Sequence, residues 1–168
     1  MRNFLVKTSI LERLSAGLCE AVVGSADEVN AQAMLEELER ANLFLIPQDN
    51  QRRWYRYHHL FADLLRQQLR QQASPAEISQ LYANASAWYE ENDYVSEAID
   101  TALIATDRRL LMRLLEQYGL PIITRNARAL PEAWLSAFSE TELEARPMLC
   151  VVAAFNDLVS RPVPPGPM

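Results

Sequence analysis

The chain has 168 residues, enough for one domain or two small ones, and its charged and apolar fractions are ordinary for a globular protein. Residues 1–75 hold nine basic and nine acidic residues, whereas residues 76–168 hold seven arginines against thirteen acidic residues and so account for the net charge of −6. Neither half has the basic surplus that is typical of nucleic-acid-binding domains. No apolar run approaches the roughly 18–20 residues of a membrane span, so we expect no membrane association.

The two cysteines, Cys19 and Cys150, lie far apart in the sequence among apolar helical neighbours. Their positions predict two buried free thiols in a reducing cytoplasm rather than a disulfide. No basic and then apolar leader precedes a small-residue cleavage site, which also favours a cytoplasmic protein. The chain opens almost directly on core-type residues, as though an upstream segment had been removed.

Residues 1–72 show the pattern of a winged helix, in which helices are followed by a hairpin and a further helix. Ser15 and Gly24 are candidate caps of one of these helices. Five apolar residues share one face of the last helix: Leu60, Phe61, Leu64, Leu65 and Leu69. We expect them to pack inside the domain together with Trp54 and Tyr57. The expected elements are helices over 16–23 and 30–41, strands over 43–46 and 54–57, and a helix from His59 to about Gln72.

Residues 73–160 show a purely helical pattern, which Ser74 and Pro75 open as an N-cap and first helical residue. The third of these helices should end at Gly119 and Pro121, and two or three more segments follow up to residue 160. Repeated short helices predict an array of α-hairpins similar to tetratricopeptide repeats, although no clean internal period is present. The proline-rich tail, residues 161–168, is expected to be disordered. The predicted fold class is therefore mainly α.

The sequence contains no motif for self-contained catalysis: it has no P-loop, nucleophile elbow or zinc-protease motif, and only four glycines. Acidic pairs such as Glu36-Glu37 and Glu90-Glu91 fall on outward helix faces, where solvated surface explains them. We therefore expect a chain that is not an enzyme and that binds no metal or cofactor by itself.

His58 and His59 are the one arrangement that could carry a binding function. Adjacent side chains should point in different directions, and no third ligand of suitable spacing is present, which argues against a metal site. His58 lies where a strand passes into a helix, so its imidazole could bind a phosphate beside the free N–H groups of the helix N-terminus. It could equally cap the helix or pack beside Trp54 and Tyr55. The spacing alone leaves both interpretations open.

Several sequence blocks resemble the large MalT-like, LuxR-type transcriptional regulators over about residues 3 to 160. The most specific is WYRYHHLFADLLR at residues 54–66, preceded by LEELERANLF at residues 35–44. The segment FLVKTSILERL at residues 4–14 is similar to the start of the family's winged helix. Looser matches to its helical repeats are AWY at residues 87–89 with EAI at residues 97–99, and RPML at residues 146–149.

This resemblance implies a segment of a signal-transduction ATPase of the STAND class. In that class a nucleotide-binding domain precedes the winged helix, and a helical region that receives the inducer follows it. DNA would be bound only by a C-terminal helix-turn-helix, which this sequence does not match. ATP or ADP and Mg²⁺ are implied for the full-length protein. Tyr57-His58-His59 is similar to a Met-His-Asp motif whose histidine contacts the β-phosphate of ADP, which makes His58 the candidate nucleotide sensor.

The resemblance favours a non-catalytic relay whose partners are the nucleotide-binding domain and an inducer on the helical region. Two alternatives belong to other classes. The winged helix could itself bind DNA through the helix over 30–41, but Glu36, Glu37 and Glu39 on that helix would repel phosphates. The chain could also be a scaffold of helical hairpins that captures a protein or a ligand.

Overall fold

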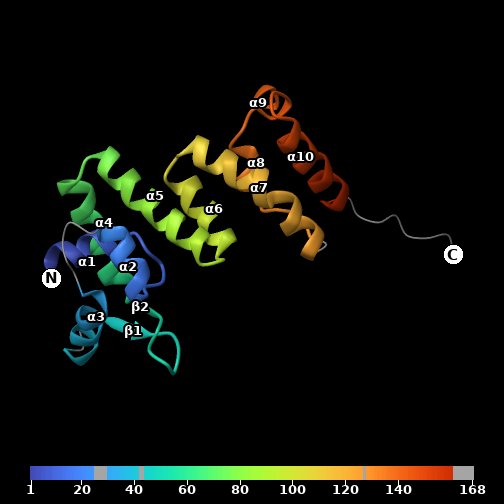
Figure 1. Cartoon of the computed structure of the whole chain (residues 1–168). Coiled ribbons are helices and arrows are strands. Elements are labelled where there is room, and N and C mark those ends of the chain that lie inside the picture. Colours follow the sequence, from blue (N-terminus) through green and yellow to red (C-terminus); the bar gives the residue numbers. More distant parts are fainter. Residues whose placement is uncertain (25–29, 42–43, 127, 161–168) are drawn as a thin grey trace. The chain divides into compact units, whose positions relative to one another are not determined.

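The computed structural model describes residues 1–24, 30–41, 44–126 and 128–160. Over these residues the fold is mainly helical with one small antiparallel hairpin, which confirms the predicted fold class (Figure 1). The predicted tail, residues 161–168, lies outside the described residues. The elements are α1 (Arg2–Thr8), α2 (Ala16–Val23), α3 (Ala31–Arg40), β1 (Leu45–Pro47), β2 (Tyr55–Tyr57), α4 (His59–Gln72), α5 (Pro75–Glu91), α6 (Val95–Ile104), α7 (Arg108–Asn126), α8 (Glu132–Ser136), α9 (Glu140–Glu144) and α10 (Pro147–Ser160).

The chain divides into two compact units, Met1–Tyr94 and Val95–Met168. This division places α5 in the first unit, whereas the sequence pattern assigned α5 to the second domain. The domain limits 1–72 and 73–160 stay a prediction. No helix in the described part of the chain is both long and apolar enough to cross a bilayer.

Helices α1 to α4 and the hairpin of the first unit enclose a core in which Leu14, Leu18, Leu35 and Leu38 are fully buried. Helix α2 has the predicted bounds because the Ser15 hydroxyl accepts a hydrogen bond from the backbone N–H of Leu18, at 3.4 Å. The helix ends at Gly24, whose φ of 86° is a conformation that glycine adopts readily.

Strands β1 and β2 pair antiparallel, with Leu45 opposite Tyr57 and Pro47 opposite Tyr55. Leu14 adds a third, short partner, because its backbone N–H and carbonyl both bond to Tyr55 at 2.8 Å. The buried Tyr57 hydroxyl hydrogen-bonds to the Thr8 hydroxyl of α1 at 2.8 Å. The two ends of β2 are therefore bonded to the N-terminal segment, at Leu14 and at Thr8, and the prediction that Tyr57 packs inside the domain is confirmed.

The predicted inward face of α4 is partly wrong. Leu60 and Leu64 are 67% and 52% exposed, whereas Ala62, Leu65 and Leu69 are buried. Apolar residues on α4 extend over an arc wider than the face that packs on α1, so helical periodicity alone does not decide which part of the arc turns inward. Phe61 lies at the edge of the buried face and is half-buried.

Helix α5 begins with a capping box. The Ser74 hydroxyl accepts from the backbone N–H of Glu77, and the Glu77 carboxylate accepts from the backbone N–H of Ser74. The helix packs on α2, where Gly17 allows the Trp88 indole to approach. Trp88 and Tyr94 also contact Trp54, which is half-buried, just before β2.

The second unit contains α6 to α10, so the helices predicted beyond residue 121 are present. The Trp134 indole of α8 is buried and donates a hydrogen bond of 2.6 Å to the Asp100 carboxylate of α6. Helix α10 packs on α7 through the fully buried Leu149 and Val152.

Two predictions for this unit are wrong. Helix α7 continues through Gly119 and Pro121 to Asn126, because α10 packs along it and Gly119 leaves room for Val152. A Cβ at Gly119 would lie 2.8 Å from the Val152 Cγ1 atom. Cys150 was expected to be buried but is exposed, since α10 turns it away from α7. Cys19, in the first unit, is buried as expected, and this burial raises the pKa of its thiol.

Candidate functional site

The junction between β2 and α4 holds the predicted sensor, His58. Its backbone has the extended conformation of an N-cap residue, with φ −58° and ψ 137°. Its carbonyl accepts the bond from the Ala62 N–H at 3.0 Å that opens α4, and its own N–H donates to the Phe44 carbonyl at 2.7 Å. His58 is therefore the N-cap of α4, as the alternative interpretation predicted, but its side chain makes no capping hydrogen bond to the helix.

The imidazole of His58 is half-buried and lies between two other rings. Its centroid is 4.4 Å from that of His59 and 6.4 Å from that of Phe44. The two histidine rings are tilted by 32°, so they lie side by side rather than pointing apart as predicted. Among the described residues, no group of three or more histidine, cysteine, aspartate or glutamate side chains could hold a metal ion.

The first turn of α4 presents backbone N–H groups that have no carbonyl four residues earlier within the helix, as in every α-helix. Helix α4 has 14 residues, and its first turn contains no acidic residue. Such an N-terminus carries a partial positive charge and can accept an anion such as a phosphate. His58 and His59 stand directly at this end, so the junction combines two imidazoles with free N–H groups.

An exposed apolar surface surrounds the junction. Phe44 is 57% exposed and stacks on Phe61 at a centroid distance of 5.3 Å, and Leu60 and Leu64 continue the surface along α4. We call Phe44, Leu60, Phe61 and Leu64 the α4 patch. Sequence reasoning missed this patch because it placed the leucines in the core. The backbone of Phe44 has a φ of 56°, a left-handed conformation that is rare for aromatic residues and that no local sequence signal predicts.

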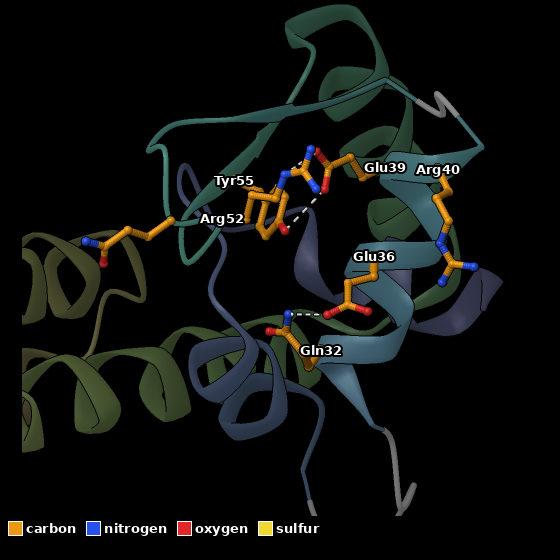
Figure 2. A pocket seen from close by; sticks show the side chains of 7 residues that line it. Gln32, Glu36, Glu39, Arg40, Arg52 and Tyr55 are labelled. Carbon is orange, nitrogen blue, oxygen red and sulfur yellow. Dashed lines mark hydrogen bonds and ion pairs between the residues drawn. The ribbon is translucent and has the colours of Figure 1, made fainter.

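A second feature is a hollow of about 560 Å³ between α3 and the loop that joins the strands (Figure 2). The Glu39 carboxylate lines this hollow, where it pairs with Arg52 at 3.3 Å and accepts a bond from the Tyr55 hydroxyl at 3.4 Å. Burial, and then the charge of Glu39, raises the pKa of Tyr55. The remaining side chains that line the hollow are Gln32, Glu36, Arg40 and Gln51.

The hollow bears on the DNA-binding alternative, because α3 is the helix that a DNA-reading winged helix lays in the major groove. Glu36 and Glu37 on this helix are exposed, and Arg52, a basic residue of the loop, is already paired with Glu39. Sequence reasoning identified the glutamates but not the hollow, which depends on a contact between Glu39 and a residue 13 positions later.

Residues 1–77 match the family model described as the MalT winged helix domain. They belong to that family. The chain is 36% identical over 166 residues to the serine/threonine-protein kinase PknK of Mycobacterium tuberculosis, strain H37Rv, and the alignment covers 98% of the chain but 14% of the kinase. It is 34% identical over 154 residues to the HTH-type transcriptional regulator MalT of Klebsiella pneumoniae, strain 342, and 32% identical to MalT of Vibrio cholerae, covering 92% of the chain and 17% of each regulator.

The resemblance to MalT-like regulators is therefore confirmed, and the similarity extends beyond the winged helix domain into the second unit. The kinase among the relatives was not anticipated from the sequence. The chain spans about a seventh of the length of the kinase relatives that it matches. The names of the kinase and of the regulators therefore describe much longer proteins, of which the aligned segment is a small part.

Proposed function

We propose that this MalT-like winged helix is a non-catalytic relay, which reports the nucleotide state of an adjacent ATPase domain to a helical region that receives an inducer. The observation that carries the proposal is the α4 junction. There an imidazole, the positive end of a helix and an exposed apolar patch share one surface.

The junction suits the phosphate of a nucleotide held by a neighbouring domain. The N–H groups of the first turn of α4 can donate to phosphate oxygens, and a protonated His58 would add a charged donor. As a helix N-cap with its backbone bonded to Phe44 and Ala62, His58 is held at a fixed position. Because the backbone of His58 is already ordered, binding of a phosphate to its imidazole costs little conformational entropy. Such a residue is suited to detecting whether a phosphate is present.

The α4 patch suits the surface of that neighbouring domain. Phe44, Leu60 and Leu64 are each more than half exposed, and contiguous apolar surface of this kind marks interaction sites. We infer that ADP bound between the two domains stabilises a closed state through His58. An inducer on the helical region, with ATP replacing ADP, would shift the population toward an open state that self-associates.

The decisive test measures ADP release from a longer polypeptide in which this segment follows a nucleotide-binding domain with ADP and Mg²⁺. His58→Ala should speed ADP release about tenfold, because a hydrogen bond to a charged group contributes roughly 1.5–3 kcal/mol. Gln67→Ala is the matched control, since it removes an exposed side chain of α4 two turns beyond the junction and should change the rate less than about twofold. ADP release that is unchanged in the His58 variant would contradict the sensor role.

The isolated chain gives a second test. It should retain neither ADP nor ATP, because its sequence contains no P-loop. It should also not shift a DNA fragment in a gel at low salt, because the exposed Glu36 and Glu37 of α3 repel phosphates. Tight binding of ATP by the isolated chain would contradict the relay, and salt-dependent binding of DNA would favour the DNA-binding alternative. The scaffold alternative predicts a chain that captures a protein or ligand irrespective of nucleotide.

A further inference from the structure

The C-terminal end of α1 is bonded to the strand that enters the α4 junction. The Thr8 hydroxyl donates to the Phe4 carbonyl at 2.7 Å and lies 2.8 Å from the Tyr57 hydroxyl. Because the single proton of the Thr8 hydroxyl is used in this way, the Tyr57 hydroxyl is the donor to Thr8. Tyr57 directly precedes His58, so this bond holds the end of β2 one residue before the proposed sensor.

The same end of α1 is also bonded to the helix that leaves the junction. The Nε atom of Arg66 on α4 donates to the Ser9 carbonyl at 2.9 Å. Thr8 and Ser9 are fully buried, and Arg66 is half-buried. Hydrogen bonds that are satisfied in a buried environment make the structure around them rigid. The two bonds therefore restrain the angle between β2 and α4 at the point where His58 lies.

A continuous set of ring contacts leads from Tyr57 to the His58 side chain. The Tyr57 ring meets Phe61 edge to face at a centroid distance of 5.7 Å, and Phe61 stacks on Phe44 at 5.3 Å. Phe44 in turn lies edge-on to His58 at 6.4 Å. Aromatic pairs prefer defined relative orientations. A shift of the Tyr57 ring would consequently reach the imidazole through side chains as well as through the backbone.

We propose that Tyr57 and Arg66 are positioning residues for His58. Bonded to α1 through Thr8 and Ser9, they hold the imidazole in its place beside the first-turn N–H groups of α4. A displacement of α1 would therefore move the imidazole. The consequence for nucleotide sensing rests on the proposed function, whereas the positioning itself is a property of this chain.

Proton NMR of the 168-residue chain tests the role of Tyr57. Tyr57→Phe removes only the hydroxyl and keeps a ring with nearly the same ring current, so a shift of the ε1 proton resonance of His58 reports a movement of the imidazole. The spectra are recorded at about pH 9, above the range in which histidine changes its charge. We expect this resonance to shift in Tyr57→Phe. Tyr55→Phe is the matched control, because it removes the same group from the same strand but from a bond to Glu39 of α3, and it should leave the resonance in place.

Thr8 provides the reciprocal variants. Thr8→Val leaves the buried Tyr57 hydroxyl without its acceptor and should also shift the His58 resonance, whereas Thr8→Ser keeps the acceptor and should leave the resonance near its original position. The double variant Thr8→Val with Tyr57→Phe removes both hydroxyls, so its shift should be smaller than the sum of the two single shifts. A resonance that neither Tyr57→Phe nor Thr8→Val moves would overturn the role of Tyr57, as would an equal shift in Tyr55→Phe.

The role of Arg66 has its own pair of variants. Arg66→Met keeps the apolar stem of the side chain but removes the donor to the Ser9 carbonyl, and it should shift the same His58 resonance. Asp63→Asn is the control, because it removes the exposed ion-pair partner of Arg66 without removing the bond to Ser9, and it should leave the resonance in place. An unmoved resonance in Arg66→Met, or an equal shift in Asp63→Asn, would overturn the role of Arg66.

ADP release from the longer polypeptide described above tests the consequence for sensing. Tyr57→Phe should speed the release roughly three- to fivefold, less than His58→Ala, because the imidazole remains but is held less firmly. Tyr55→Phe should change the rate less than about twofold. Release that is faster in His58→Ala but unchanged in Tyr57→Phe would overturn the inference. Release that His58→Ala itself leaves unchanged would contradict the sensor role, while the NMR shifts would still decide the positioning.

Discussion

The backbone N–H of His58 donates a hydrogen bond of 2.7 Å to the carbonyl of Phe44, across a separation of 14 residues. This bond joins the residue before β1 to the first residue of the α4 junction. Phe44 adopts a φ of 56° at the same point. The position of the imidazole thus depends on a backbone conformation that is unfavourable for an aromatic residue.

The conformation of Phe44 predicts the order of stability of two variants. Phe44→Gly removes the unfavourable left-handed conformation but also the stacking on Phe61, so the two effects partly offset each other. Phe44→Val places a β-branched side chain at positive φ and should be less stable than Phe44→Gly by about 1–2 kcal/mol. Urea unfolding followed by circular dichroism measures the difference. Equal stability would show that the left-handed conformation is not retained in solution.

The exposure of α4 predicts that its leucines differ in their contribution to stability. Leu60→Gln should change the free energy of unfolding by less than about 0.5 kcal/mol, because Leu60 is 67% exposed. Leu65→Ala should cost roughly 2–4 kcal/mol, because Leu65 is 5% exposed and its removal leaves a cavity. The comparison uses the same urea titration. A Leu60 variant that is as unstable as the Leu65 variant would mean that the α4 patch is buried in the isolated chain.

Close packing of α7 on α10 predicts that Gly119→Ala is destabilising, although alanine is the better helix former by about 1 kcal/mol. The new Cβ would lie 2.8 Å from Cγ1 of Val152, and overpacking of this kind costs roughly 1–3 kcal/mol. The double variant Gly119→Ala with Val152→Ala removes the opposing methyl groups. It should be less unstable than the sum of the two single variants, as measured in a double-mutant cycle by thermal unfolding.

The N-terminus of α9 predicts a local pH dependence. The backbone N–H of Ser139, then its hydroxyl, and then Arg108 donate to the Glu142 carboxylate and lower the pKa of this group from 4.5 to about 2. Because the folded pKa is below the unfolded value, the folded chain binds fewer protons between these two pH values. The stabilisation is therefore complete above about pH 4.5 and is lost as the pH falls toward 2.

Carbon-13 NMR of the Glu142 carboxyl group checks this pKa. Ser139→Ala removes the hydroxyl donor and should raise the pKa of Glu142 toward 4.5, and Arg108→Gln should raise it by a smaller amount. A Glu142 pKa that neither substitution changes would contradict the described contacts.

Local signals in the sequence predicted those elements whose limits depend on neighbouring residues. Ser15 and Gly24 gave the bounds of α2, and Ser74 with Pro75 gave the start of α5. The extent of α7 could not be predicted in this way, because Gly119 is kept in the helix by a contact with Val152, which is 33 positions later. The packed face of α4 was also not predictable from local signals, because contacts with α1 decide which of its apolar residues are buried.

The candidate site could be predicted in part. The change from strand to helical periodicity located His58 at the start of α4. The ring contacts of His58 with Phe44 and His59 depend on the fold of the hairpin, and the strand pattern does not determine them. The hollow beside Glu39 was likewise not predictable, since it needs Arg52, a loop residue with a φ of 53°, to turn back toward α3.

The aromatic contacts beside β2 make two of the three tryptophans of the chain direct neighbours. Trp54 lies just before β2 and Trp88 on α5, and their ring centroids are 6.3 Å apart, while the Arg13 guanidinium covers Trp54 at 4.6 Å. Any rearrangement that moves the hairpin against α5 must change the surroundings of both indoles at once. Intrinsic fluorescence can therefore follow such a motion as it occurs, without an attached dye.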